Sequence, residues 1–145
     1  KACSCSPIMI MRYQKKISGP LLDRIDLHVE VPRVSFDKLS TDELAESSAN
    51  IRARVEAARE RQAHRFKGTR CITNSDMTSR ELKQFCILND ESTNILRQAV
   101  IQMHLSARSF HRLLKLARTI ADLDAKENIE TQHVAEALQY RTKVG

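Results

Sequence analysis

The sequence is short of the residues that interrupt regular structure, and it is short of aromatic ones. Its 145 residues include three Gly, three Pro, no Trp and 4% aromatic residues, while 41% of the residues are hydrophobic. So little Gly and Pro argues against a loop-rich or all-β chain. The shortage of aromatic residues favours a helical core packed from Ala, Leu and Ile, and the length fits one domain, or one small domain with part of another.

Two further absences concern the compartment. The sequence contains no apolar run long enough to span a membrane, and it shows no secretory signal. Its four cysteines have mixed spacings, which indicates a reducing environment rather than a disulfide framework. We therefore expect a cytoplasmic protein that makes no contact with a membrane.

The most informative segment that is present covers residues 18–32, SGPLLDRIDLHVEVP. Apolar and polar residues alternate over Ile25–Val31, which predicts a half-buried strand, and a short helical turn before it places Arg24 at a corner. No other segment resembles a second strand, and a single strand cannot satisfy its own backbone groups. We therefore expect a piece of a larger protein, in which this strand pairs with another copy or with an extended piece near Phe36.

The rest of the chain is patterned for helices. Apolar residues recur at three- and four-residue steps, with N-terminal capping residues before several of the runs. Thr78 with Glu81 predicts a capping box, and Gly68 predicts the stop after the helix that ends at residue 66. This pattern predicts helices over residues 7–17, 47–66, 78–86, 89–104, 106–123 and 131–140. A turn-rich stretch at 34–46 reads as a linker. The predicted organisation is an α/β remnant at 1–33, the linker at 34–46, and a helical bundle at 47–145.

Positive charge is concentrated at the start of that bundle. The net charge is +6, and residues 47–70 hold seven Lys or Arg side chains against two Glu. A basic surface attracts the phosphates of nucleic acids or nucleotides, although a merely solvated helix face has the same composition. The candidates for contact with nucleic acid are Arg52, Arg54, Arg59, Arg61, Arg65 and Lys67.

Two arginines stand out by their position. Arg108 occupies the second or third position of the helix that Ser106 caps, where positive charge opposes the helix dipole. Stability gives no reason for this placement, whereas an arginine at a helix N-terminus suits an anion. A bond from Arg108 to a nearby carboxylate, or an orientation toward solvent, is the alternative. Arg24 has the corresponding alternative of a surface ion pair with Asp23 or Asp26, which would contribute little.

Four blocks of this sequence resemble the C-terminal part of the magnesium-chelatase-like AAA+ ATPases, and in particular the ComM/YifB group of competence-related proteins. The resemblance covers nearly the whole chain. SGPLLDRIDLHVEVP and the LSAR…ARTIADL…AEALQYR series are specific to this family. The blocks are Ser4–Pro32, residues 46–54 (ESSA followed by IRAR), Leu105–Leu123 and His133–Arg141.

This resemblance implies a fold and two site residues. The fold would be mainly α: a C-terminal helical lid bundle preceded by a remnant, one helix and one strand, of the AAA+ α/β core. LLDRID resembles the arginine-finger motif, so Arg24 would reach the γ-phosphate of ATP held by a neighbouring subunit. The segment that begins Ser106-Ala107-Arg108 resembles the sensor-2 helix, with Arg108 as the sensor arginine. Arginine fingers are worth about 10³–10⁵ in rate.

The same resemblance implies cofactors and partners. The chain has no GxxxxGK[ST] loop and no acidic strand for Mg²⁺, both of which lie upstream in the family. We expect ATP and Mg²⁺ in the full-length protein, a homo-oligomeric ring, expected to be a hexamer, and neither tight nucleotide binding nor hydrolysis by this segment alone. Cys3 and Cys5 resemble half of a zinc site of the full-length protein, and we expect no metal here.

Three functions remain open from the sequence. The first is a DNA-acting motor related to branch-migration helicases, to which Arg24 and Arg108 would contribute in ATP hydrolysis. The second is a helical module that binds DNA or a partner protein without catalysis. The third is the motor subunit of a magnesium-chelatase-type complex that inserts metal into a tetrapyrrole.

Overall fold

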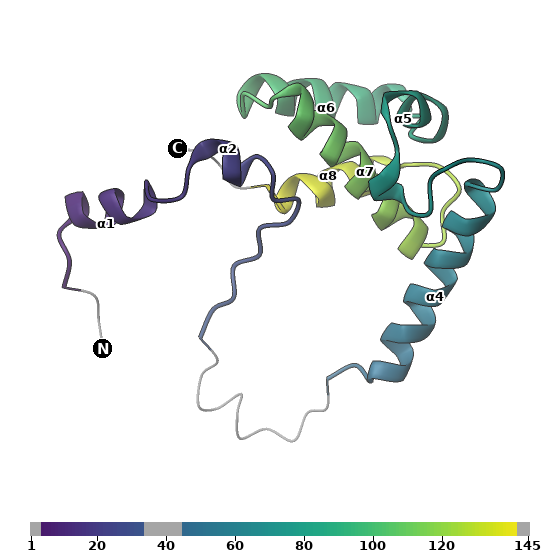
Figure 1. Cartoon of the computed structure of the whole chain (residues 1–145), viewed down its shortest axis with the longest axis horizontal. Helices are drawn as coiled ribbons and strands as arrows, with labels where there is room; N and C mark the ends of the chain where they lie inside the picture. Colours follow the sequence, from purple (N-terminus) through teal and green to yellow (C-terminus); the bar gives the residue numbers. More distant parts are fainter. Residues whose placement is uncertain (1–3, 34–44, 142–145) are drawn as a thin grey trace.

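A computed structural model of the chain describes residues 4–33 and 45–141, and these residues are mainly α-helical, as predicted (Figure 1). Segments in which apolar residues recur at helical spacing form the longer helices, and the side chains of Ser47, Thr78, Asn89 and Ser106 cap four of them. The elements are α1 (Pro7–Gln14), α2 (Gly19–Leu22), α4 (Ser48–Arg65), the 3₁₀ turn η1 (Asn74–Asp76), α5 (Ser79–Phe85), α6 (Asp90–Gln102), α7 (Ala107–Leu123) and α8 (Thr131–Gln139).

Local capping chemistry sets the helix ends. The Thr78 backbone N–H donates to Glu81 Oε2 at 2.9 Å, which is half of the predicted capping box of α5. Asn89 caps α6 by accepting from the Ser92 N–H at 2.8 Å. Gly68, just after α4, has a φ of 82°, a left-handed conformation that glycine adopts without strain.

Helix α7 is the centre of the bundle. It contacts α4, α5, α8 and η1, and α6 packs on α8. Its inner face carries the apolar residues that the helical spacing predicted, and the core they form with α8 is almost free of solvent. The completely buried residues include Leu113, Ala117, Ala121, Val134 and Ala137.

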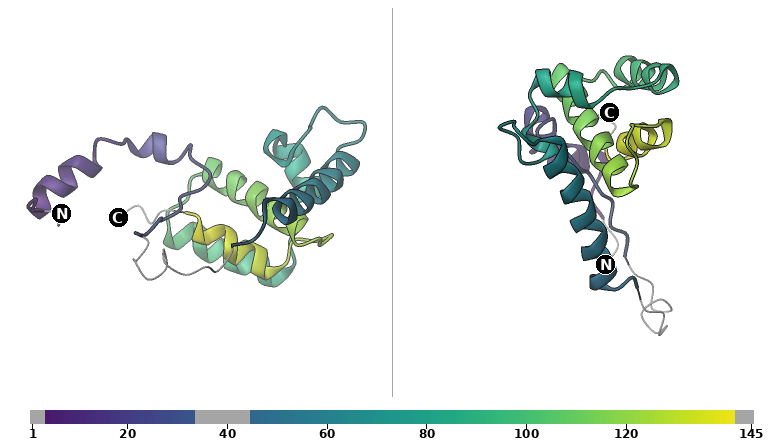
Figure 2. Two further views of the ribbon diagram at one scale, coloured as in Figure 1. Left: turned by 90° about the horizontal axis from the view of Figure 1, so that it is seen from below. Right: turned by 90° about the vertical axis from the view of Figure 1, so that its right-hand side faces the viewer.

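Helix α4 packs along only half of its length. Ala58, Gln62 and Phe66 are buried, whereas Ile51 and Val55, which share their helical stripe, are 42% and 43% exposed. In Figure 2 the N-terminal half of α4 projects beyond the other bundle helices. The first three turns of this helix therefore present side chains on every side.

The N-terminal helix lies apart from the bundle (Figures 1 and 2). Its large apolar side chains are exposed, among them Ile8 at 71% and Tyr13 at 72%. Large apolar residues clustered in this way usually mark a surface that another body covers.

The predicted strand over Ile25–Val31 is not present. Within residues 4–33 and 45–141, the β pairing amounts to an isolated parallel bridge between Leu88 and Ile129. A strand needs a neighbouring strand, and the described part of the chain offers none. The segment instead bonds to the helical bundle through its backbone: the His28 N–H donates to the Tyr140 carbonyl at 2.9 Å. Phe36, the other predicted neighbour, lies outside the described residues.

Candidate functional site

The N-terminus of α7 is where Arg108 lies. Ser106 caps this helix by accepting from the Ser109 N–H at 3.1 Å, and Arg108 is its second residue, with an exposed side chain. No acidic residue lies in the first turn of α7. The positive end of the helix dipole and the guanidinium of Arg108 thus lie together without a local counter-charge.

That counter-charge comes from the other end of the chain. Asp23 accepts hydrogen bonds from the hydroxyls of Ser106, at 3.1 Å, and of Ser109. The pKa of Asp23 is lowered, mainly because Ser109 bonds to its ionised form. Ser106 and the positive charges of Arg141 and Arg108 act in the same direction. Asp23 therefore supplies the negative charge that the first turn of α7 lacks.

Through this contact the structure brings both predicted arginines to one end of α7. Arg24 directly follows Asp23, and Arg108 lies between the two serines that hold Asp23. The Arg24 side chain is exposed, and its Nη1 donates to the Pro20 carbonyl at 2.8 Å. This end of the molecule can offer two guanidinium groups to an anion.

Two more arginines, which the sequence analysis did not single out, bind the segment around Arg24. We call this segment, residues 23–26, the corner. Arg112, one turn after Arg108 in α7, donates to the Arg24 carbonyl and to Asp26 Oδ1, the latter at 2.5 Å. Arg141, which follows α8, donates to the Ile25 carbonyl at 3.2 Å and to the Ser109 carbonyl at 3.3 Å. The bonds of Arg112 and Arg141 to the Arg24–Asp26 segment span more than 80 residues of sequence, so no local pattern reveals them.

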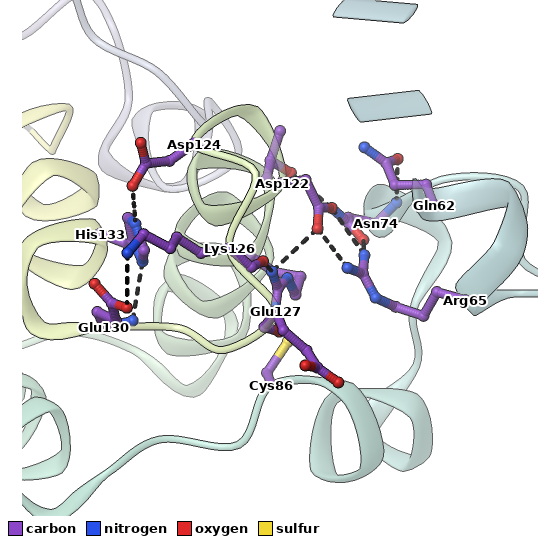
Figure 3. Close-up of polar contacts among 12 residues, drawn as sticks. Gln62, Arg65, Asn74, Cys86, Asp122, Asp124, Lys126, Glu127, Glu130 and His133 are labelled. Carbon is purple, nitrogen blue, oxygen red and sulfur yellow. Dashed lines mark hydrogen bonds and ion pairs between the residues drawn. The ribbon is translucent and has the colours of Figure 1, made fainter. Parts of the chain in front are cut away.

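A second polar cluster lies inside the bundle (Figure 3). Asp122 of α7 is 2% exposed and accepts two hydrogen bonds from Arg65 of α4. Asn74 of η1 donates to Asp122 at 2.8 Å and accepts from Arg65 at 3.1 Å. Arg118 forms a further ion pair with Asp122, at 3.1 Å. One buried carboxylate therefore joins α4, η1 and α7.

The same cluster affects a cysteine and an arginine. Burial raises the pKa of the Cys86 thiol to about 11, so this thiol stays protonated near neutral pH. Burial also lowers the pKa of Arg118, against the attraction of Asp122. Arg118 donates to the carbonyls of Lys126 and Glu127 at 2.8 and 2.7 Å, which ties the α7–α8 turn to the core.

The structure separates the predicted nucleic-acid contacts into two groups. Arg65 is occupied by Asp122, with 15% of its side chain exposed, and Arg54 pairs with Glu46 at 3.0 Å on the surface. The others project into solvent, and within the described ranges no ion pair holds them. They are Arg52, Arg59, Arg61 and Lys67.

Of the predicted half of a zinc site, Cys5 is an exposed free cysteine, and Cys3 lies outside the described residues. Within 4–33 and 45–141, no group of three or more potential ligands could hold a metal ion. Nor does any helix in these ranges have the length and apolar character that crossing a bilayer requires.

Two family models match the chain. The model described as "Magnesium chelatase, subunit ChlI C-terminal" matches residues 45–141, and the one described as "Magnesium chelatase, subunit ChlI" matches residues 1–39. The first covers more than half of the chain. The protein belongs to the magnesium chelatase subunit ChlI family, of which it represents the C-terminal part.

Curated relatives agree with this assignment. The chain is 42% identical over 140 residues to "Competence protein ComM" of Haemophilus influenzae, and 44% identical over 138 residues to the protein YifB of Escherichia coli. A YifB protein of Salmonella typhimurium is 40% identical. These matches cover 96%, 94% and 94% of this chain. The chain spans only about a quarter of the relatives' own length, namely 27%, 26% and 26%.

Proposed function

We propose that this chain is the lid-bearing segment of a ring-forming AAA+ ATPase and that it contributes Arg24 and Arg108 to ATP hydrolysis. Membership of the ChlI family supports the ATPase class. In the assembled ring Arg24 acts as the arginine finger and Arg108 as the sensor arginine. Both offset the negative charge that develops on the γ-phosphate, with ATP and Mg²⁺ held by the upstream core.

The observation that carries this proposal is the contact between Asp23 and the first turn of α7. It holds the Arg24 corner against the helix that carries Arg108. Because this contact keeps both arginines at one end of α7, we infer that they serve one nucleotide. If Arg24 reaches the nucleotide of the neighbouring subunit, Arg108 reaches the same one, and the ring closes each active site across a subunit interface.

The exposed apolar surface of α1 and of the segment after Arg24 supports the assembly. Ile8 and Tyr13 in α1, and Val29 and Val31 after the corner, are between 65% and 85% exposed. In the full-length protein the upstream core covers this surface, and Ile25–Val31 gains the neighbouring strands that it lacks here.

For the work of the motor we propose movement on DNA, in the manner of a branch-migration helicase. The observation that favours DNA is the solvent-facing side of α4, which exposes Arg52 on the projecting half and Arg59 and Arg61 on the half that packs on the bundle. The second candidate is a helical module that binds DNA or a partner without catalysis, and the third is the motor of a metal-insertion complex acting on a tetrapyrrole. Stimulation of the ATPase by DNA distinguishes the first candidate from the third.

The experiment is substitution of each arginine in the full-length protein. Arg24→Ala should leave ATP binding intact and lower kcat by about 10³-fold or more, since a finger acts only in the transition state. Arg108→Ala should lower kcat as well. ATP affinity by equilibrium binding and turnover by steady-state kinetics separate the two effects.

Arg97→Ala is the matched control, because Arg97 is an exposed arginine of α6 that forms no ion pair with any residue in 4–33 or 45–141. Its turnover should equal that of the unaltered protein. Normal hydrolysis by Arg24→Ala would refute the finger, and an unchanged rate at all ATP concentrations would remove Arg108 from the site. Loss of ATP binding in both variants would mean that Arg24 and Arg108 bind the nucleotide rather than stabilise the transition state.

A further inference from the structure

The corner that carries Arg24 has no regular structure of its own to hold it. The four-residue helix α2 ends at Leu22, and the chain after Arg24 pairs with no strand in the described residues. Short helices are unstable in isolation, and unpaired backbone groups must find partners elsewhere. The local bonds from the Arg24 side chain to the Pro20 carbonyl and from the Arg24 amide to the Leu21 carbonyl shape the turn but do not place it against α7. The position of Arg24 relative to α7 must therefore come from contacts with the bundle.

The bundle supplies a partner for four consecutive residues of this corner. Asp23 is held by the two serines of α7, as described above. Arg112 of α7 donates to the carbonyl of Arg24 itself and to the carboxylate of Asp26. Arg141, beyond α8, donates to the carbonyl of Ile25.

Each of the two holding arginines bonds to two groups at once, and the Arg112–Asp26 pair lies at the surface, with 59% of the Asp26 side chain exposed. Arg141 is 9% exposed, and it also donates to the Ser109 carbonyl, so it joins the corner directly to the first turn of α7. Arg112 is 28% exposed and bonds to two groups of the corner at once. A guanidinium that donates to two acceptors fixes direction as well as distance.

From this geometry we infer that Arg112 and Arg141 are positioning residues, which hold the backbone of Arg24 in a fixed relation to Arg108. Neither need touch the nucleotide; they act through the corner. This inference rests on the proposed function for its catalytic consequence, but the mechanical part stands on the contacts alone. Without Arg112 the Arg24 carbonyl and Asp26 lose their partner, and the corner moves relative to α7.

Hydrogen exchange measures the mechanical part in the chain itself. The amides of Arg24, Ile25 and His28 donate to the carbonyls of Leu21, Leu22 and Tyr140 at 3.0, 3.1 and 2.9 Å. Their exchange rates therefore report opening of the corner. In Arg112→Gln we expect these rates to rise about tenfold or more, the size of a lost charge-assisted hydrogen bond. Arg112→Lys keeps the charge beside Asp26 and should recover part of the protection.

Two controls distinguish a local effect at the corner from a general loss of stability. Arg97→Gln removes an exposed arginine of α6 and should leave corner exchange unchanged. The Phe66 amide, bonded to the Gln62 carbonyl at 2.9 Å at the end of α4, should exchange equally slowly in all variants. Unchanged corner exchange in Arg112→Gln would overturn the inference.

The catalytic part is measured by turnover of the full-length protein. In Arg112→Gln, kcat should fall about ten- to a hundredfold while KM for ATP stays within about twofold, because a displaced finger affects the transition state and not binding. Faster corner exchange with normal kcat would overturn the positioning role. Arg24→Ala then separates the two failures: if that variant is also normal, the proposed function is wrong, and if its hydrolysis collapses, only the inference is wrong.

Discussion

At the scale of single residues, two carboxylates organise the described part of the molecule. Asp23 places the corner at the end of α7, and Asp122 joins α4 to α7 inside the bundle. Each binds groups that are distant in sequence. The negative charge that the helix start around Arg108 lacks is provided by Asp23, a residue 85 positions earlier.

The contact between Asp23 and α7 should contribute a pH-dependent part of the free energy of unfolding. The pKa of Asp23 is lowered below 3.8, mainly by the hydrogen bond from Ser109, so the folded protein favours the ionised carboxylate. The contribution to stability is present above about pH 3.8 and is lost as pH falls through the lower folded-state pKa. Because this group is near the surface, we expect less than about 1 kcal/mol.

The measurement is the free energy of unfolding in urea from pH 7 to pH 2 for the unaltered chain and for Asp23→Asn. The difference between the two should shrink toward the acid end of this range. A difference that stays constant with pH would show that the charge of Asp23 contributes nothing.

At the scale of elements, capping chemistry was predictable and long-range contacts were not. Gly68, the Thr78–Glu81 pair and Ser106 were all recognised because a helix end depends on neighbours within four residues. The prediction of a strand over Ile25–Val31 was wrong for the described chain. The alternation of this segment is real, but a strand forms only where a neighbouring strand is available, which no pattern within the segment can tell.

The same distinction explains the site. Arg24 and Arg108 were singled out by motif and by position, whereas Arg112 and Arg141 were not, because their partners lie more than 80 residues away. Arg65 was assigned to a basic surface since it follows Arg61 on a charged helix. Only the fold reveals that its turn of α4 faces Asp122.

The two capping residues of α6 and α7 provide a test at this scale. Both Asn89→Ala and Ser106→Ala remove an N-cap and should lower the free energy of unfolding by about 1 kcal/mol. Only Ser106 also bonds to Asp23, so only Ser106→Ala should speed hydrogen exchange at His28. Urea unfolding and amide exchange give the two quantities. Equal exchange at His28 in both variants would contradict a role of Ser106 in holding the corner.

At the scale of the whole molecule, charge and shape coincide at α4. Its solvent-facing side carries exposed arginines, Arg52 on the projecting half and Arg59 and Arg61 closer to the bundle, and the net charge of the chain is +6. A basic helix whose outer half extends beyond the bundle can lie along a phosphate backbone while the bundle keeps its structure. The sequence indicated the positive charge. The structure adds that Arg52, Arg59 and Arg61 are exposed and form no ion pair within the described ranges, so they can contact phosphates.

This surface should bind DNA in a salt-dependent way. The chain should bind double-stranded DNA at low salt, and each phosphate contact should contribute about 0.9 to the slope of log K against log[salt]. Arg52→Gln/Arg59→Gln/Arg61→Gln should reduce that slope by up to about 3. Fluorescence anisotropy over a series of salt concentrations measures it.

The control is Arg80→Gln/Lys83→Gln/Arg97→Gln, which removes the same charge from exposed positions on α5 and α6. This variant should keep most of the slope. Equal losses in the two triple variants would mean that binding follows net charge alone, and absence of binding at low salt would remove DNA from the proposed function.

The junction of Arg65, Asn74 and Asp122 has one more consequence. Apolar contacts let two helices slide or roll past each other at small cost, whereas hydrogen bonds to a carboxylate tolerate little rotation. Helix α4 is anchored by such bonds near its C-terminal end, while its outer turns have no support. The direction of α4 therefore depends on one buried acid as well as on the packing of Ala58, Gln62 and Phe66, and we expect a change at Asp122 to move the outer end of α4 although no residue there is altered.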